Sequence, residues 1–180
     1  EILMKPKKEL IKDAINYFIK AINIDYQFIQ AYDNLGKAYR MIEKYDSAIK
    51  TYEMSLKVFP SGISAHQNLA VIYVKQKNWD KAIYEYKILT NLVPLNPEGY
   101  YGLANVYKKN SKLNLALSNA LKALELYKQN PTNYIGDSYG QVGLIYYDLG
   151  NKLEAKTYIQ KAKNTYISNN LEDYFYKTFP

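Results

Sequence analysis

Apolar and small side chains recur along the chain at the spacing of an α-helix. In the stretch "LGKAYRMI" the apolar positions stand three or four residues apart, at Leu35, Ala38, Tyr39 and Ile42. That period places them on one face of a helix and leaves the polar residues on the other. Similar segments return throughout the 180 residues, and no convincing strand pattern interrupts them. The sequence therefore predicts an all-α protein.

The helical pattern is itself repeated at a fixed interval. The stretches "NLGKAYRMIEKYDSAIKTY" and "NLAVIYVKQKNWDKAIYEY" begin 34 residues apart. Alanines that open one segment recur after 34, 34, 34 and then 39 residues, at Ala14, Ala48, Ala82, Ala116 and Ala155. Three further columns keep this register: Leu35, Leu69, Leu103 and Val142; Gly36, Ala70, Ala104 and Gly143; Tyr39, Tyr73, Tyr107 and Tyr146. Such a period is typical of stacked helix–turn–helix units.

The columns have the chemistry of paired helices. Small residues in the Gly36 and Ala48 columns allow two backbones to approach closely, and the aromatic residues fill the remaining space. Short oxygen-bearing side chains are expected to cap the second helix of three pairs, at Asp46, Asp80 and Asn114. Pro60, Pro94 and the Gly150–Asn151 step are expected to mark ends of helices or turns.

This register resembles the tetratricopeptide repeat, a 34-residue helix–turn–helix unit. The stretches "AYDNLGKAYRMIEKYDSAIKTYEMSLKVFP" and "AHQNLAVIYVKQKNWDKAIYEYKILTNLVP" fit that pattern almost throughout, and the resemblance covers about residues 8 to 167. It implies a right-handed α-solenoid of stacked antiparallel helix pairs, a tetratricopeptide-repeat superhelix. It also implies that the first helix of each pair lines a concave groove, and that the groove binds a peptide or helical segment of another protein.

A single array over residues 1–180 is expected. Residues 8–25 correspond to the second helix of a repeat whose first helix would lie before Glu1, in a longer chain. Four repeats follow at 29–62, 63–96, 97–130 and 136–168, with five extra residues near "KQNPTNYIG". Residues 169–180, which are rich in aromatic side chains, are expected to form a capping segment.

The candidate partner-binding residues lie on the face of each first helix that is opposite the packed face. They are Asn34, Lys37 and Arg40; Asn68, Val71 and Lys75; Tyr101, Asn105 and Lys108; and Tyr147. The same register also places Gly102, Gly140 and Gln141 on this face.

Asparagine amides are the first informative feature of this face. Asn34 and Asn68 occupy equivalent positions one repeat apart. An amide can both donate to and accept from an extended peptide backbone, so the pair predicts a grip on main-chain groups. The alternative is that asparagine is simply common at this position of the repeat.

Charge and apolar side chains give two further indications. The basic residues Lys37, Arg40, Lys75, Lys108 and Lys109 favour an acidic segment. Asp33, Glu98, Asp137 and Asp148 partly offset them, and a solvated basic face is the alternative. The apolar residues Val71, Val74, Tyr101, Leu144 and Tyr147 favour a helical or hydrophobic segment. Some family members clamp a terminal carboxylate, but only Lys37 and Asn68 match that clamp, so the complete clamp is absent.

Composition removes several other classes of function. The net charge is +7, but Arg40 is the only arginine, which argues against sequence-specific reading of nucleic acid. Without cysteine the chain has no disulfides and no thiolate metal sites. No stretch of about 20 apolar residues predicts insertion into a membrane. No cofactor and no metal ion is expected.

Catalytic chemistry has little support in the sequence. His66 is the only histidine, and it stands in an aromatic packing column, so a core histidine is the better interpretation than a general base. Glu53 and Glu85 are expected on exposed helix faces, and Trp79 is expected in the core. The sequence predicts no active site.

Two alternatives to groove binding stay open. The missing first helix and the aromatic tail leave apolar surface, so the array is also consistent with a scaffold that self-associates through its ends. The third interpretation is a repeat appendage of a larger enzyme.

Overall fold

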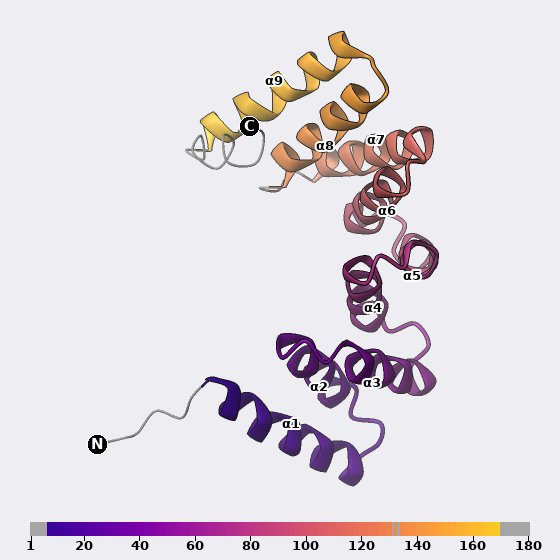
Figure 1. The fold of residues 1–180 in the computed structure, drawn as a ribbon, viewed down its shortest axis with the longest axis vertical. Helices are drawn as coiled ribbons and strands as arrows, with labels where there is room; N and C mark the ends of the chain where they lie inside the picture. The colour runs from indigo at the N-terminus through magenta and orange to yellow at the C-terminus, as the bar shows by residue number, and fades with distance from the viewer. Residues whose placement is uncertain (1–6, 131, 133, 170–180) are drawn as a thin grey trace, which may run out of the picture. The chain divides into compact units, whose positions relative to one another are not determined.

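The computed structural model describes residues 7–130, 132 and 134–169. Within these residues every regular element is an α-helix, and successive helices are joined by short turns (Figure 1). The helices are α1 (Lys7–Ile24), α2 (Ile29–Met41), α3 (Tyr45–Val58), α4 (Ile63–Lys75), α5 (Trp79–Leu92), α6 (Pro97–Lys109), α7 (Leu113–Gln129), α8 (Ile135–Asp148) and α9 (Lys152–Ser168). The expected all-α repeat fold is confirmed. The predicted capping segment lies, apart from Asn169, outside the described residues.

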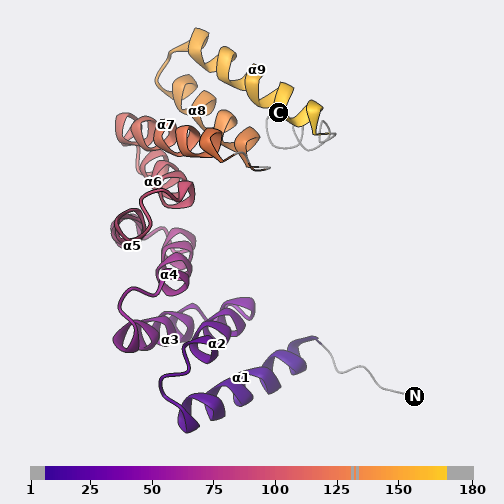
Figure 2. The ribbon, with the colours of Figure 1, turned by 180° about the vertical axis from the view of Figure 1, so that it is seen from behind.

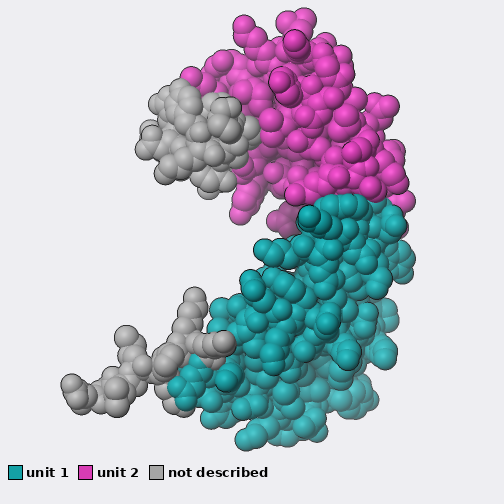
Figure 3. Space-filling view, viewed as in Figure 1, with its two compact units in different colours: residues 1–85 teal, residues 86–180 magenta. Residues whose placement is uncertain are grey.

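The helices form two compact units, Glu1–Glu85 and Tyr86–Pro180, and the boundary falls within α5 (Figure 3). In unit 1, α2 packs against α1 on one side and α3 on the other, and α4 packs against both α2 and α3. A core cluster joins α1 to α2, and it is formed by Ile15, Leu35 and Ala38 together with Ile11, Phe18, Ile22, Tyr39 and Ile42. The alternation of first and second helices therefore follows the predicted pairing within this unit.

Unit 2 repeats the same arrangement. Helices α6 and α7 form one pair, α8 and α9 form the next, and α8 contacts both α7 and α6. In the last pair Ala162 and Tyr166 are buried, with Tyr139 and Ile159 packed against them. Helix α7 has 17 residues where α3 and α5 have 14, so part of the five-residue insertion lengthens this helix.

Glycines allow the close contacts within each unit. A Cβ atom added at Gly36 would overlap the ring of Tyr52, which is 0% exposed. A Cβ at Gly143 would lie 2.9 Å from two side-chain atoms of Ile159. Gly102 was expected on the exposed face, but this is wrong. It is buried, and a Cβ there would overlap the ring of Tyr86, so helix packing requires this glycine.

The three residues predicted to cap second helices lie inside those helices. Helices α3, α5 and α7 begin at Tyr45, Trp79 and Leu113, so Asp46, Asp80 and Asn114 are each the second residue of a helix. Asp46 and Asp80 therefore act through the positive end of the helix dipole and not as side-chain caps. The clearest cap was not predicted: the Oδ1 atom of Asn96 accepts from the Glu98 N–H at 2.9 Å, with Pro97 as the first residue of α6.

Each of the first helices α2, α4, α6 and α8 is followed, two positions after its last residue, by a residue with left-handed backbone geometry. These residues are Glu43, Lys77, Ser111 and Gly150, with φ angles of 58°, 58°, 56° and 82°. In each turn the N–H of the following residue donates to the carbonyl of the tyrosine five residues earlier, which belongs to the Tyr39 column, as Asn78 does to Tyr73 at 2.8 Å. This is the Schellman arrangement, in which glycine is favoured because it has no Cβ. Of these four residues, only Gly150 could be predicted from the sequence to adopt this geometry.

Lys77→Gly is expected to raise the free energy of unfolding by about 0.5–1 kcal/mol, because a β-carbon is disfavoured in this conformation. Urea denaturation followed by circular dichroism at 222 nm measures the effect. Lys57→Gly, at an exposed position near the end of α3, is the matched control and should lower stability by about 0.5–1 kcal/mol. A loss of stability in both variants would contradict the assignment.

Candidate partner-binding surfaces

The first surface lies on α2 and α4, the two first helices of unit 1, which contact each other. Of the predicted residues on α2, Asn34 and Lys37 are exposed and Arg40 is half-buried. On α4, Val71 and Lys75 are exposed and Asn68 is half-buried. We call this the α2–α4 surface, defined by these six residues. It presents basic groups on both helices.

The two asparagines of this surface differ in their hydrogen bonding. The Asn68 amide nitrogen donates to the Ser64 carbonyl oxygen at 2.8 Å, one turn earlier in the same helix. It also lies 3.5 Å from the Ser64 hydroxyl oxygen. Part of the hydrogen-bonding capacity of Asn68 is therefore used within α4. A joint grip by Asn34 and Asn68 on a peptide backbone stays a prediction.

Two buried polar atoms, one on α2 and one on α3, lack a hydrogen-bond partner, and the sequence did not predict this. The hydroxyl of Tyr52 and the Oδ1 atom of Asp33 have no hydrogen-bond partner within the described part of the chain. Burial raises the pKa of Tyr52 above its ordinary value; the nearby Arg40 opposes this effect and Asp33 reinforces it. The hydroxyl is therefore a neutral donor and acceptor. Nothing in the sequence indicated that this hydroxyl would be unpaired.

The second surface lies on α6 and α8 in unit 2. Tyr101, Asn105 and Lys108 are half-buried on α6, whereas Tyr147 on α8 is exposed. Lys108 Nζ on α6 lies 3.1 Å from the Asp148 carboxylate on α8, so its charge is partly compensated by the first helix of the next repeat. The positive charge expected at Lys108 is therefore weaker than the sequence suggested.

Two other residues assigned to this second surface are not exposed. Gly140 and Gln141 are buried, contrary to expectation. The Gln141 Nε2 atom donates to the Tyr101 carbonyl at 3.1 Å and joins the two helices. Leu144 and Tyr147 stay exposed on α8. The α6–α8 surface is thus more apolar and less basic than the α2–α4 surface.

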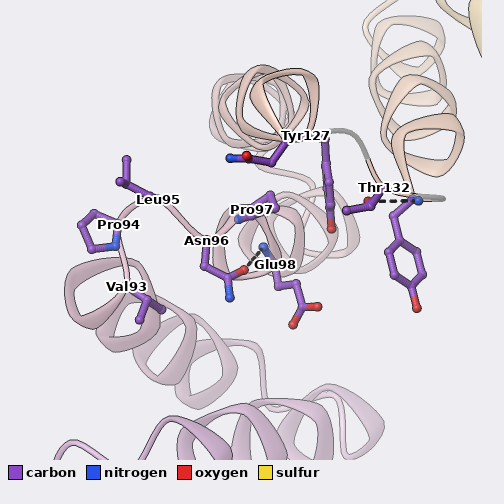
Figure 4. Close-up of a pocket in the computed structure, with 10 residues that line it drawn as sticks. Val93, Pro94, Leu95, Asn96, Pro97, Glu98, Tyr127 and Thr132 are labelled. Atoms are coloured by element: carbon purple, nitrogen blue, oxygen red, sulfur yellow. Dashed lines mark hydrogen bonds between the residues drawn. The ribbon is translucent and has the colours of Figure 1, made fainter.

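An open depression of about 640 Å³ lies elsewhere in unit 2 (Figure 4). Its lining is mainly apolar and comes from the turn before α6, the end of α7 and the start of α8: Val93, Pro94, Leu95, Asn96, Pro97, Glu98, Tyr127, Asn130, Thr132 and Tyr134. Burial raises the pKa of Tyr127 to about 12, with smaller contributions from Glu98 and Asp137, so its hydroxyl is neutral. Most of these residues lie in connections between repeats, where the repeated sequence pattern makes no prediction.

The single histidine is buried, as predicted, but its partner was missed. His66 Nδ1 lies 2.6 Å from Glu85 Oε2, and both side chains are nearly inaccessible. Its Nε2 lies 3.0 Å from the Pro60 carbonyl oxygen, which can only accept, so Nε2 carries a hydrogen. The prediction of an exposed Glu85 is wrong, because the carboxylate is held inside by this pair. Both ring nitrogens of His66 are engaged in internal contacts.

Other functional chemistry was sought across the described residues. Trp79 is half-buried and not in the core, which corrects the prediction. Over the range that could be searched, His, Asp and Glu side chains form no group of three suited to a metal ion. In the same range, every helix is too short or too polar to span a membrane.

Paired helices with exposed first-helix surfaces define the class of protein, a helical-repeat module for protein interaction. Family models described as tetratricopeptide repeat match residues 31–58, and 97–130 with 136–164, and one described as TPR repeat matches residues 72–111. Together they cover more than half of the chain, which belongs to the tetratricopeptide repeat family. Its partners are therefore proteins.

Similar folds are found among solved structures. A crystal structure of MamA has a TM-score of 0.79 at 21% identity, and the match covers 89% of this chain and 91% of that one. MamA from Desulfovibrio magneticus RS-1 has a TM-score of 0.78 at 16% identity, covering 88% and 86%. At these identities the likeness concerns the fold alone. No curated protein sequence matches the chain.

Proposed function

We propose that the α2–α4 surface binds an acidic segment of a partner protein in an extended or helical conformation. The observation that carries this proposal is the basic character of this surface: Lys37 on α2 and Lys75 on α4 are exposed, and Arg40 is half-buried on α2. These groups would attract carboxylates of the segment. The exposed Asn34 amide could donate to and accept from its main chain.

The α6–α8 surface, within unit 2, is proposed to bind apolar side chains. Leu144 and Tyr147 are exposed on α8, and exposed apolar groups of this kind contribute to recognition of hydrophobic side chains. The test below concerns the α2–α4 surface.

A display library of random linear peptides, selected on the immobilised chain, tests the proposal. Acidic peptides are expected to be enriched. Lys37→Ala/Lys75→Ala should weaken the selected peptide by at least about fivefold at low salt, because charge complementarity is lost. Lys50→Ala/Lys57→Ala removes the same charge from the exposed side of α3 and should leave affinity within about twofold.

Isothermal titration calorimetry measures these affinities, and urea denaturation checks that each variant stays folded. Selected peptides whose affinity is unchanged in Lys37→Ala/Lys75→Ala would place the binding surface elsewhere and overturn the proposal.

A further inference from the structure

The depression in unit 2 has one wall whose shape is fixed by the chain itself. This wall is the turn before α6, where Pro94 and Pro97 restrict the backbone. The Asn96 N–H donates to the Val93 carbonyl at 2.9 Å, and the Asn96 side chain accepts from the Glu98 N–H at the same distance. Figures 1 and 2, seen from opposite sides, both show α6, α7 and α8 side by side, as their packing requires. A ligand would therefore meet a wall that is already formed.

The rest of the lining offers apolar and aromatic surface. Tyr127, at the end of α7, is 5% exposed, whereas Leu95 and Tyr134 at the rim are 77% and 59% exposed. Figure 4 shows the side chains of Glu98 and Tyr127 between the turn before α6 and Thr132. A volume of about 640 Å³ lies within the range of sites that bind small ligands, so it has room for more than one side chain. The depression is therefore suited to a short peptide stretch.

This depression carries negative charge, although the chain as a whole has a net charge of +7. Among the described residues that line it, Glu98 is the one charged residue, and it is exposed. Glu98 and Asp137 lie in the first turns of α6 and α8, and both raise the pKa of Tyr127, so both carboxylates lie close to this wall. A helix N-terminus carries only about half a positive charge, which does not cancel a full carboxylate.

The lysine beside Tyr127 in the sequence does not neutralise this charge within the depression. Lys128 Nζ lies 5.6 Å from the centroid of the Tyr139 ring, and neither residue lines the depression. The site therefore favours a cationic group that can also pack on apolar and aromatic surface.

An arginine side chain has the chemistry that this lining requires. Its guanidinium is planar and weakly hydrated, so it packs on a tyrosine ring at a lower cost in lost hydration than the compact ammonium of lysine. It makes two parallel hydrogen bonds to one carboxylate, which an ammonium does not. Its aliphatic stem lies along apolar surface while its charged end reaches an acid.

We propose that this depression binds an arginine side chain of a partner protein, in a segment where an apolar residue adjoins the arginine. The guanidinium would contact the Glu98 carboxylate and the Tyr134 ring, and the apolar neighbour would contact Leu95. A carboxylate accepts several hydrogen bonds, so Glu98 can hold the guanidinium together with its contacts inside the chain. The site lies within unit 2, and its ligand has the opposite charge to the one proposed for the α2–α4 surface.

A display library of random linear peptides, selected on the immobilised Lys37→Ala/Lys75→Ala chain, supplies the probe. This background lacks the two exposed lysines of the α2–α4 surface, so the outcome does not depend on the earlier proposal. Peptides with an arginine beside an apolar residue are expected to be enriched. A selection that enriches no such peptide would overturn the inference.

Fluorescence anisotropy of the selected peptide then measures the part played by the acid. Glu98→Gln keeps the shape of the side chain but removes its charge, and it should weaken binding by at least about fivefold. Glu154→Gln removes an exposed glutamate from the first turn of α9 and is the matched control, whose affinity should stay within about twofold. Equal affinities of the two variants would place the peptide elsewhere.

Changes in the peptide test the cation. Citrulline has nearly the shape of arginine without its charge, so this replacement should weaken binding by about tenfold or more. Lysine in the same position should weaken it by about threefold or more, because its ammonium is more strongly hydrated. A citrulline peptide that binds as tightly as the arginine peptide would show that charge is not recognised and contradict the assignment.

Cross-linking locates the peptide, since the chain has no cysteine of its own. A selected peptide with cysteine in place of the apolar residue should form a disulfide with Leu95→Cys under mild oxidation. Leu153→Cys on α9 is the matched control, because Leu95 and Leu153 are 77% and 76% exposed. It should link at least about tenfold more slowly, since no bound peptide is held beside it. Equal rates would reject the site, and circular dichroism confirms that each variant keeps its helices.

Discussion

His66→Leu is expected to lower the free energy of unfolding by about 3–5 kcal/mol, the typical cost of leaving one member of a buried ion pair without its partner. The variant would leave the Glu85 carboxylate, now held 2.6 Å from Nδ1, in an environment with little access to water. It would also remove the donor to the Pro60 carbonyl. Urea denaturation at pH 7 measures the change.

The control is His66→Leu/Glu85→Leu, in which both charged groups are replaced by apolar ones. Replacing a complete buried pair is often neutral or stabilising, so this double variant should recover most of the loss. If it is as unstable as His66→Leu alone, the loss comes from misfitted packing at position 66 and the ion pair is not its cause.

The same pair should make stability depend on pH. The hydrogen bond to Glu85 raises the pKa of His66 above its ordinary value of 6.5, burial opposes that rise, and the Pro60 carbonyl contributes to it. A raised folded pKa means that this stabilisation is fully present below about pH 6.5 and is lost as pH increases through the folded value. Unfolding free energy should therefore fall above pH 6.5, by at most about 1.4 kcal/mol per pH unit.

His66 is the only histidine and the chain has no cysteine, so this slope can be assigned to one side chain. The slope should disappear in the double leucine variant. Unfolding free energies measured between pH 6 and 8.5 provide the comparison. A wild-type profile that is flat, or that rises across this range, would contradict the assignment.

Gly36→Leu should cost about 1–3 kcal/mol or more through overpacking, even though leucine favours the helix over glycine. The new Cβ would overlap the Tyr52 ring, which is fully buried, so the ring or the helix must shift. Lys37→Leu adds the same side chain at the next, exposed position of α2 and should change stability by no more than about 0.5 kcal/mol.

A double-mutant cycle identifies the atoms responsible. If the overlap with Tyr52 causes the loss, Gly36→Leu should cost at least about 1 kcal/mol less in a Tyr52→Ala background than in the wild type. Additive effects of the two substitutions would mean that Gly36 is not packed against Tyr52, and the helix register of α2 and α3 would need revision.

The fold could be predicted because its signal is repeated. Leu35, Leu69, Leu103 and Val142 are all buried, as their common column requires. Where a prediction used a single residue, it was less accurate. Glu85 was expected in water because carboxylates usually are, and only its distance from His66 in space explains its burial.

For the candidate partner-binding residues, the exposed position of several could be predicted, but their hydrogen bonds could not. The repeat register correctly predicted that Lys37 and Val71 are exposed, because helix periodicity alone determines on which face of the helix a residue lies. It could not show that Lys108 pairs with Asp148, because the two lie 40 residues apart in adjacent repeats. The unpaired Tyr52 hydroxyl was equally hidden, since it follows from the absence of a neighbour.

The left-handed residues that end the first helices have a consequence for motion. In a helical repeat, stability is approximately a sum of terms for single repeats and for neighbouring pairs. Glu43, Lys77 and Ser111 each hold their own turn in a conformation that suits glycine better. Substitution of one exposed turn residue can therefore change how often its helix pair unfolds locally. The frequency of local unfolding in one repeat can thus be altered while every residue that faces a partner stays unchanged.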